Sequence, residues 1–344
     1  MDLDNHTLTH LRPTMNKIKT IAAATLLAIS GLNVSAQTLL NASYDVAREF
    51  YKDYNAAFIA NYKKTTGKDV KIDQAHGGSS AQARAVNDGL DADVVTMNTT
   101  TDIDFLAGKG IVAADWNKRF PHAASPTSST MLFLTRNGNP KNIKDWDDLI
   151  KPGIQVIVVN PKTGGNGRMA YLAAWGYVRK KGGSEADAAA FVAKLYKNVP
   201  VLAKGGRDAT TIFLQRNIGD VLVTFESEVI SVDNEFGAGK VDAIHPSISI
   251  VAENPVAVVE RTVAKKGTGD LAKAYLNYLY SDEAQEIAAK HALRPTNPAI
   301  LKKYSKTFKP LQLFTVNEVF GSFAEAQKVH FNDGGQFDKL YTVK

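Results

Sequence analysis

The chain has 344 residues, no cysteine, 44% hydrophobic residues and a formal charge of +6 at pH 7. The lack of cysteine excludes disulfides, thiolate metal sites, cysteine nucleophiles and a lipid anchor on an N-terminal cysteine. The mild positive charge is not gathered into Lys/Arg clusters interleaved with aromatic residues, so it favours encounter with anions rather than nucleic-acid binding.

The N-terminus has the order of a secretory signal. A basic stretch, Met15–Lys19, precedes the apolar run Ile21–Leu32, and the small residues Val34-Ser35-Ala36 follow. The run is too short to span a bilayer stably. We expect residues 1–36 to be a signal peptide, cleaved near Ala36, and the product to reside in the periplasm. The polar leader before the basic stretch is unusual, so Met15 is a candidate initiator.

Short β-branched runs then alternate with segments of helical period. In chain order they are Thr38–Ser43, Val46–Lys64, Val70–Gln74, Ala81–Gly89 and Asp93–Met97. This βαβαβ order predicts a mostly parallel sheet covered by helices. Ligands of such a sheet lie at the carboxyl ends of strands and the amino ends of helices.

A second α/β series follows. Its expected elements are Met131–Thr135, Ile154–Val159, Gly167–Lys180, Ala186–Leu195, Ala209–Gln215 and Asp220–Thr224. Two series predict two lobes, and the chain is long enough to bury two cores. We expect residues 37–119 to form the first part of lobe 1 and 120–232 to form lobe 2. Residues 233–310 could return to either lobe and are placed in lobe 1, across a hinge. Residues 311–344 are expected to form helices that pack across the lobes.

Three loops each follow a predicted strand, are rich in glycine or small hydroxyl residues, and open a helix. They are 76–80 (His-Gly-Gly-Ser-Ser), 163–167 (Thr-Gly-Gly-Asn-Gly) and 205–208 (Gly-Gly-Arg-Asp). Glycine lets backbone NH groups approach a ligand, and a first helical turn leaves NH groups unsatisfied at the positive end of the helix dipole. One such loop is commonplace, but three on one face predict an anion cradle. None is a P-loop or a dinucleotide-binding motif.

Residues for catalysis or metal binding form no convincing set. The histidines are scattered singly, and no zinc or nucleophile-elbow motif occurs. Glu226 and Glu228 are a weak carboxylate pair because they lie only two residues apart. We therefore predict a binding protein that needs no metal and no cofactor. A secreted hydrolase or transferase that holds a phosphate or sulfate ester is the less favoured alternative. The three tryptophans, Trp116, Trp146 and Trp175, are expected to pack in the cores.

Longer segments carry a resemblance to a known family. They include Ser43–Glu49, Asp73–Ser79, Trp146–Gly153, Tyr171–Gly176 and Phe331–Gly335. In these segments the chain resembles the periplasmic sulfate-binding and thiosulfate-binding proteins of ABC transporters, a type II solute-binding family. The resemblance spans essentially the whole expected mature chain. It implies a two-lobed α/β fold with a hinge, and a monomer that captures sulfate or thiosulfate for a membrane permease.

The resemblance also implies a set of ligand contacts. In that family NH groups, a few hydroxyls and, in sulfate-type members, an indole NH hold the dianion without a counter-charge in contact. By position the implied contacts are Asp45 (through its backbone NH), Ser79, Gly164, Gly165, Asn166 and Gly206, with Phe225 lining the cleft. Candidates for further contacts are Ser80, Thr163 and Ser227.

The chain departs from the family pattern at two of these positions. Gly164 replaces a serine whose hydroxyl touches the anion, and Phe225 replaces the indole donor, so Phe225–Glu228 resembles the thiosulfate-type members. Asp45 is also an N-cap residue by type and place, and capping explains it as well as ligand binding does. We hypothesise that its carboxylate faces away, because a site made only of donors rejects hydrogen phosphate. A receptor for phosphate or molybdate is the alternative within this class.

Overall fold

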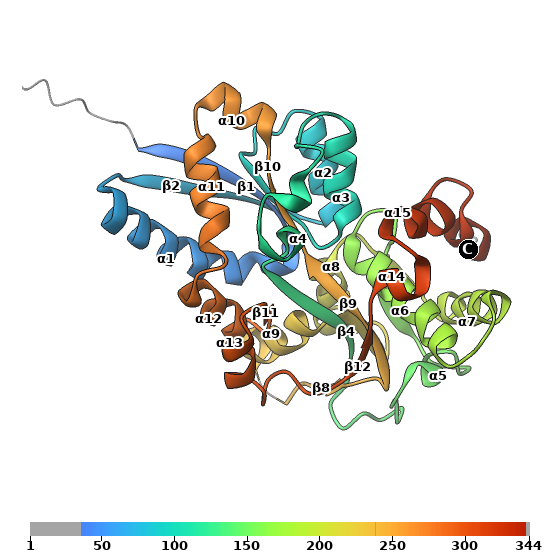
Figure 1. The fold of residues 1–344 in the computed structure, drawn as a ribbon. Helices are drawn as coiled ribbons and strands as arrows, with labels where there is room; N and C mark the ends of the chain where they lie inside the picture. Colours follow the sequence, from blue (N-terminus) through green and yellow to red (C-terminus); the bar gives the residue numbers. More distant parts are fainter. Residues whose placement is uncertain (1–35, 238, 342–344) are drawn as a thin grey trace, which may run out of the picture. The chain divides into compact units, whose positions relative to one another are not determined.

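The computed structural model describes residues 36–237 and 239–341, without the side chains of 233–236 (Figure 1). The predicted signal peptide therefore lies outside the described residues, apart from Ala36. From Ala36 onward the chain forms one unit by its contacts, and this unit contains two β-sheets, each covered by its own helices.

The smaller sheet has the strand order β10-β3-β1-β2. Its strands are β1 (Gln37–Tyr44), β2 (Val70–Gly77), β3 (Val94–Thr96) and β10 (Val256–Val258). β1 pairs in parallel with β2 and β3, and β10 adds antiparallel to β3. The connections and cover are η1 (Asp45–Ala47), α1 (Arg48–Thr66), α2 (Ser79–Asn87), α3 (Thr100–Gly108), η2 (Trp116–Lys118), α4 (Pro121–Ala124), α10 (Glu260–Lys266), α11 (Gly269–Tyr278) and α12 (Asp282–Lys290).

Helix α1 shows why this cover packs. Phe50, Tyr54 and Phe58 follow one another at four-residue spacing, so they form a single stripe, and all three are buried. The stripe packs against Tyr275 of α11, whose ring lies 5.1 Å from that of Tyr54. Each buried ring contributes roughly 1.5–3 kcal/mol. The helix ends at Gly67, where a φ of +73° suits glycine and closes the last turn.

The larger sheet has the order β12-β9-β4-β7-β5-β6, with β8 and β11 also paired to β4. Its strands are β4 (Thr127–Arg136), β5 (Val156–Val159), β6 (Leu202–Ala203), β7 (Val221–Phe225), β8 (Val241–Ile244), β9 (Ile248–Asn254), β11 (Arg294–Pro295) and β12 (Gln312–Phe314). The helices that accompany it are α5 (Trp146–Leu149), α6 (Gly165–Lys180), α7 (Glu185–Lys197), α8 (Gly206–Thr210), η3 (Thr211–Gln215), α9 (Glu226–Phe236), α13 (Pro298–Lys303), α14 (Val316–Phe320), α15 (Phe323–Ala326), η4 (Gln327–Phe331) and α16 (Gln336–Leu340).

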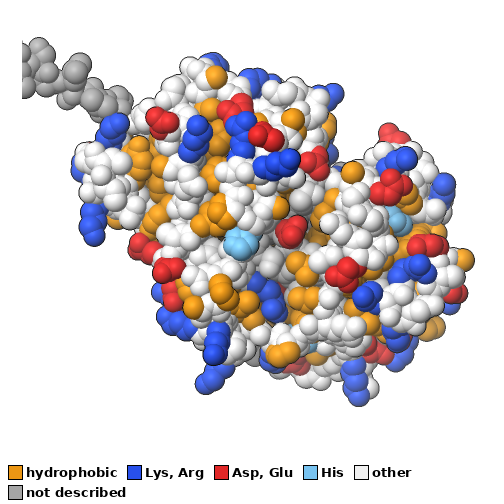
Figure 2. All heavy atoms as spheres, in the orientation of Figure 1, with side chains coloured by type: hydrophobic (Ala, Val, Ile, Leu, Met, Phe, Trp, Pro, Cys, Tyr) orange, Lys and Arg blue, Asp and Glu red, His pale blue; other side chains and the backbone are white. Residues whose placement is uncertain are grey.

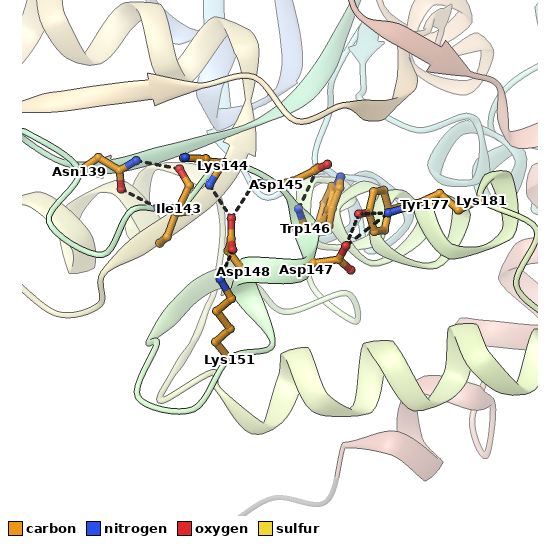
Figure 3. Close-up of polar contacts among 10 residues, drawn as sticks. All are labelled: Asn139, Ile143, Lys144, Asp145, Trp146, Asp147, Asp148, Lys151, Tyr177 and Lys181. Atoms are coloured by element: carbon orange, nitrogen blue, oxygen red, sulfur yellow. Dashed lines mark hydrogen bonds and ion pairs between the residues drawn. The ribbon is translucent and has the colours of Figure 1, made fainter.

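Helix α6 is the central helix of this second layer. Its residues from Gly165 to Tyr177 are buried. A Cβ on Gly176 would overlap the Phe314 ring of β12, so glycine at this position allows strand and helix to pack closely. Trp146 fixes the neighbouring corner, because its indole donates to the Ile248 carbonyl at 2.9 Å. The Asp145 and Asp148 side chains cap α5 there (Figure 3). All three tryptophans are buried, which confirms their predicted packing role.

The two-lobed α/β fold predicted from the sequence is confirmed, with two differences in detail. The larger sheet is mixed rather than mostly parallel, because β4 pairs antiparallel with β7, β8 and β9. Strands β8 and β9, expected in the return to lobe 1, belong to the larger sheet, whereas β10 joins the smaller one. Most C-terminal contacts are with lobe 2, where β12 extends the larger sheet and Phe331 and Phe337 enter its core. The lobe boundaries themselves stay predictions.

Candidate anion-binding site

The loops that leave the carboxyl ends of β1, β2, β5 and β6 come together. A Cβ on Gly78, in the loop after β2, would lie 2.9 Å from the Thr163 carbonyl oxygen and 3.2 Å from that of Lys204. Gly205, after β6, would in turn meet the Gly78 Cα at 3.7 Å. Two loops of the smaller sheet thus face two loops of the larger one, as the rule for ligand sites in α/β sheets requires.

Each of these loops opens a helix whose first NH groups precede the first helical hydrogen bond. In α2 that bond comes from Ala81 to the Gly78 carbonyl, in α6 from Arg168 to Gly164, and in α8 from Ala209 to Gly205. The NH groups ahead of these donors have no partner within their own helix. They are those of Ser79, Ser80, Gly165, Asn166, Gly167, Gly206, Arg207 and Asp208. The positive ends of three helix dipoles therefore meet at one place.

Close packing explains the glycines in this region. A Cβ on Gly165 would overlap the Asn98 side-chain oxygen and lie 2.8 Å from Thr99 Cγ2. A Cβ on Gly206 would lie 2.5 Å from Val46 Cγ2. Both distances are shorter than real Cβ contacts. The two glycines consequently let the loops approach one another so that backbone groups face inward.

The Asp45 side chain is turned toward the start of α8, and the hypothesis that its carboxylate faces away from a bound anion stays a prediction. Its Oδ2 accepts a hydrogen bond from the Arg207 NH at 3.1 Å. Gly205, the N-cap residue of α8, has no side chain, and Asp45 of the smaller sheet therefore caps α8 of the larger one. Burial raises the pKa of Asp45, while the NH groups of Arg207, Val46 and Gly206 lower it. The carboxylate thus uses donors that belong to the predicted anion cradle.

The Ser79 hydroxyl is also engaged within the protein. It donates to Asp102 Oδ2 at 2.6 Å, and it accepts from the Asn98 NH at 3.3 Å. Asp102 Oδ1 receives the Arg168 guanidinium at 3.0 Å. This ion pair is buried, and it joins α3 of lobe 1 to α6 of lobe 2 directly behind the loops. The Ser79 hydroxyl is therefore occupied, whereas its backbone NH has no partner within α2.

The other predicted site residues have different surroundings. Asn166 lies with the loops: its Nδ2 donates to the Thr224 hydroxyl at 3.1 Å, and its Oδ1 is buried with no partner among the described residues. Phe225 packs in the core of the larger sheet. The Thr163 hydroxyl donates to the Lys204 carbonyl at 3.0 Å. Ser227 is buried with a hydroxyl that is unpaired in the described part of the chain.

Titratable side chains near the loops are either uncharged or paired with another side chain. Burial, together with Arg48, lowers the pKa of His76 to about 4, so this histidine is uncharged at neutral pH. Glu226 forms a two-point ion pair with Arg294, at 2.7 Å and 3.0 Å. Glu228 is fully buried, and it accepts from the Thr210 hydroxyl and from the Arg207 guanidinium. Both glutamates therefore have structural partners, which argues against a catalytic pair.

Residues 45–294 match the family described as bacterial extracellular solute-binding protein. The thiosulfate-binding protein of Pseudomonas aeruginosa is 54% identical over 317 residues, which are 92% of this chain and 96% of that protein. The sulfate-binding protein of Escherichia coli K12 is 49% identical over 316 residues, again 92% and 96% of the two chains. The chain belongs to the bacterial extracellular solute-binding proteins, in the branch of the sulfate-binding and thiosulfate-binding proteins.

A solved structure agrees with this assignment. The sulfate-binding protein SubI from Mycobacterium tuberculosis H37Rv superimposes with a TM-score of 0.79 at 30% identity, covering 86% of this chain and 100% of that one. As a member of the solute-binding family, the chain is a binding protein rather than an enzyme. Among the described residues there is no cluster of three or more His, Asp or Glu side chains fit to hold a metal, and no helix is long and apolar enough to cross a membrane.

Several residues of this solute-binding protein's site were missed from the sequence. Asn98 and Thr99 follow β3 directly, and Asn98 Oδ1 is buried without a partner among the described residues. Asp102 and Arg168 form the ion pair behind the loops. The position of Asn98 and Thr99 at the carboxyl end of a parallel strand was a usable signal. No such signal exists for the pairing of Asp102 with Arg168, because this pairing depends on how α3 and α6 pack.

A groove elsewhere offers less to a ligand. It has a volume of about 370 Å³ and lies along α5, α6 and α7. Its polar groups satisfy one another: the Tyr177 hydroxyl donates to Asp147 at 2.7 Å, and Lys181 donates to Tyr177 at 2.8 Å (Figure 3).

On the face drawn in Figure 2, basic and acidic side chains are interspersed rather than segregated. The prediction that the protein binds no nucleic acid remains untested.

Proposed function

We propose that the protein captures sulfate or thiosulfate between its lobes in the periplasm and delivers the anion, as a monomer, to the membrane permease of an ABC transporter. The observation that carries the proposal is that α2, α6 and α8 all begin beside η1. The first NH groups of each of these helices have no partner within that helix. Relatives at 54% and 49% identity are named for thiosulfate and sulfate binding, respectively. Export through the predicted N-terminal signal belongs to the same proposal.

The site suits an anion without protons. Backbone NH groups of Asp45, Ser79, Gly165, Asn166 and Gly206 are donors only, and they match a fully deprotonated oxyanion. Hydrogen bonds to a charged group contribute about 1.5–3 kcal/mol each, so a handful support micromolar or tighter binding after the cost of lobe closure. The Asp45 carboxylate and the side-chain oxygens of Asn98 and Asn166, which are unpaired among the described residues, are acceptors beside this set, and for this reason phosphate is an informative competitor.

Calorimetry with sulfate, thiosulfate, phosphate and molybdate tests the proposal. Sulfate or thiosulfate should bind with one-to-one stoichiometry and no product, and phosphate should bind more weakly. If neither sulfate nor thiosulfate binds, the proposed function is wrong. Tighter binding of phosphate or molybdate would instead identify the alternative receptor.

Gly164 tests the hydroxyl that this chain lacks. A Cβ at this position would lie 2.8 Å from Val159 Cγ1, so any substitution also displaces Val159. Gly164→Ala is therefore the matched control for Gly164→Ser, because both add the Cβ and only serine adds the donor. We expect Gly164→Ser to bind sulfate about tenfold more tightly than Gly164→Ala, the effect of one added hydrogen bond. Equal affinities would show that the missing hydroxyl does not limit sulfate binding.

A further inference from the structure

A second cavity lies behind the helix-end loops. It has a volume of about 290 Å³, and both lobes form its walls. α2 and α3 supply one side, and α6 and η4 supply the other; α15, which runs into η4, contacts α3 (Figure 1). Polar side chains in its lining include those of Ser80, Arg84, Thr101, Arg168, Gln327 and Asn332. Ser80 follows Ser79 of the loop region directly, so the cavity and the loops share the first turn of α2.

The cavity contains polar groups that nothing in the described part of the protein satisfies. Ser80 is 3% exposed, and its hydroxyl has no hydrogen-bond partner among the described residues. At the opposite wall, Gln327 is half-buried; its Oε1 atom is buried with no partner among the described residues, while its Nε2 donates to Asn332 Oδ1 at 3.1 Å. Buried polar atoms are nearly always paired, so the unmatched Ser80 hydroxyl indicates a missing partner at this cavity, whereas the Gln327 oxygen only accepts and does not bond to an oxyanion. This partner must be small and polar.

The charge of the walls specifies an anion. Arg84 lies one helical turn after Ser80, so both side chains are on the same face of α2. Arg84 is exposed, and no ion pair of its guanidinium is found among the described residues. The buried guanidinium of Arg168 adds no net charge, because it pairs with Asp102, and it also donates to the Thr101 hydroxyl and the Pro161 carbonyl. The carboxylate in the wall, Asp102, is already neutralised by Arg168 and accepts from Ser79 and Thr99 as well.

We propose that this cavity is a second binding site, one that holds a small oxyanion by side chains. Arg84 supplies the net charge, the Ser80 hydroxyl donates from the floor, and the amides of Gln327 and Asn332, which are hydrogen-bonded to each other at 3.1 Å, close the rim. The proposal rests on the proposed function for the class of anion but not for the location. Because both lobes contribute walls, an anion here stabilises the closed arrangement. By linkage, the primary ligand and the second anion then strengthen each other's binding.

Selenate, with its heavy scattering atom, is the probe that locates the sites. Crystals of the protein grown with tens of millimolar selenate should show two selenium peaks, one among the helix-end loops and one in the cavity. A single peak at the loops would overturn the second site. The lack of a peak at the loops would count against the proposed function instead, so the two failures are distinguishable.

Arg84→Gln is the decisive variant, with Arg216→Gln as its control. Both residues are exposed arginines, so both variants lose the same charge. Arg84→Gln should weaken the second binding event about tenfold or more, as expected for one lost charge-assisted hydrogen bond, and should leave the first event unchanged. Ser80→Ala should weaken it by a smaller factor. An adventitious ion only is the conclusion if Arg84→Gln and Arg216→Gln retain the second event equally, and the proposal is then wrong.

Order of addition tests the coupling between the sites. Sulfate titrated into wild-type protein already saturated with thiosulfate should bind the cavity more tightly than sulfate titrated into the Gly165→Ala variant, whose loops bind the primary anion much more weakly. Equal affinities would overturn the linkage, because a cavity walled by both lobes would then form without the primary ligand.

Discussion

The helix-end loops and the cavity behind them share α2 and α6, but they present different groups. At the loops the inward-facing donors are backbone NH groups, and glycine occupies the positions where a Cβ would collide. In the cavity the polar groups are side chains, with Arg84 and Ser80 one turn apart on α2. Adjacent residues, Ser79 and Ser80, thus belong to regions with different chemistry.

This contrast separates two ways of holding a charge. A backbone cradle is fixed by the fold, so it tolerates most changes of side chain but not the addition of one. A side-chain site is tuned residue by residue and is weaker, because flexible side chains lose rotamer freedom when they bind. Substitutions at the loops should therefore act through steric blocking, and substitutions in the cavity through the loss of individual donors.

The largest effect is expected at Arg168, which belongs to both regions. Arg168→Ala removes the buried partner of Asp102 and should lower the free energy of unfolding by about 3–5 kcal/mol, because an uncompensated charge remains. Urea denaturation measures this loss. Arg119→Ala, which breaks exposed ion pairs with Asp115 and Glu260, is the control and should cost no more than about 1 kcal/mol. A similarly small cost for Arg168→Ala would mean that the ion pair does not tie the regions together.

The next largest effect is expected at Gly165, where the backbone cradle is most crowded. Gly165→Ala places a Cβ on the Asn98 side-chain oxygen and should weaken anion binding about a hundredfold, equivalent to roughly 2.7 kcal/mol. Gly108→Ala is the matched control, since Gly108 is also helical and nothing lies within 4 Å of the added Cβ. Calorimetry measures the affinity. Full affinity in Gly165→Ala would remove the distinction between the two regions.

The sequence predicts those parts of the site that depend on a local pattern, but not those that depend on contacts between distant segments. The glycine-rich loops were found because a strand, a glycine run and a helix have a local pattern. The role of the Asp45 side chain as a cap of α8 was not predicted, because it depends on the capless start of that helix, far away in sequence. The Asp102–Arg168 pair and the second cavity depend on how α3, α6 and η4 pack, which no local pattern records.

The smallest effect on the free energy of unfolding is expected for a substitution of Glu228, behind the loops. This effect should depend on pH. Burial raises the pKa of Glu228, despite the opposing influence of Arg207. Below the pKa of about 4.3 for an unfolded glutamate, the folded and unfolded states are both protonated. As the pH rises above it, the unfolded state ionises more easily, so Glu228 destabilises the fold. The stability of Glu228→Gln relative to the wild type should therefore increase between pH 4 and pH 8.

Glu318→Gln should change in the opposite direction. Its hydrogen bond with Lys180 lowers the pKa of Glu318, so the carboxylate stabilises the fold at neutral pH and ceases to do so as acid protonates it. Relative to the wild type, this variant should lose stability as the pH rises. Urea titrations of both variants at several pH values compare the two slopes. If they have the same sign, the Glu228 carboxylate is better solvated than its burial indicates, and the wall behind the loops is open to water.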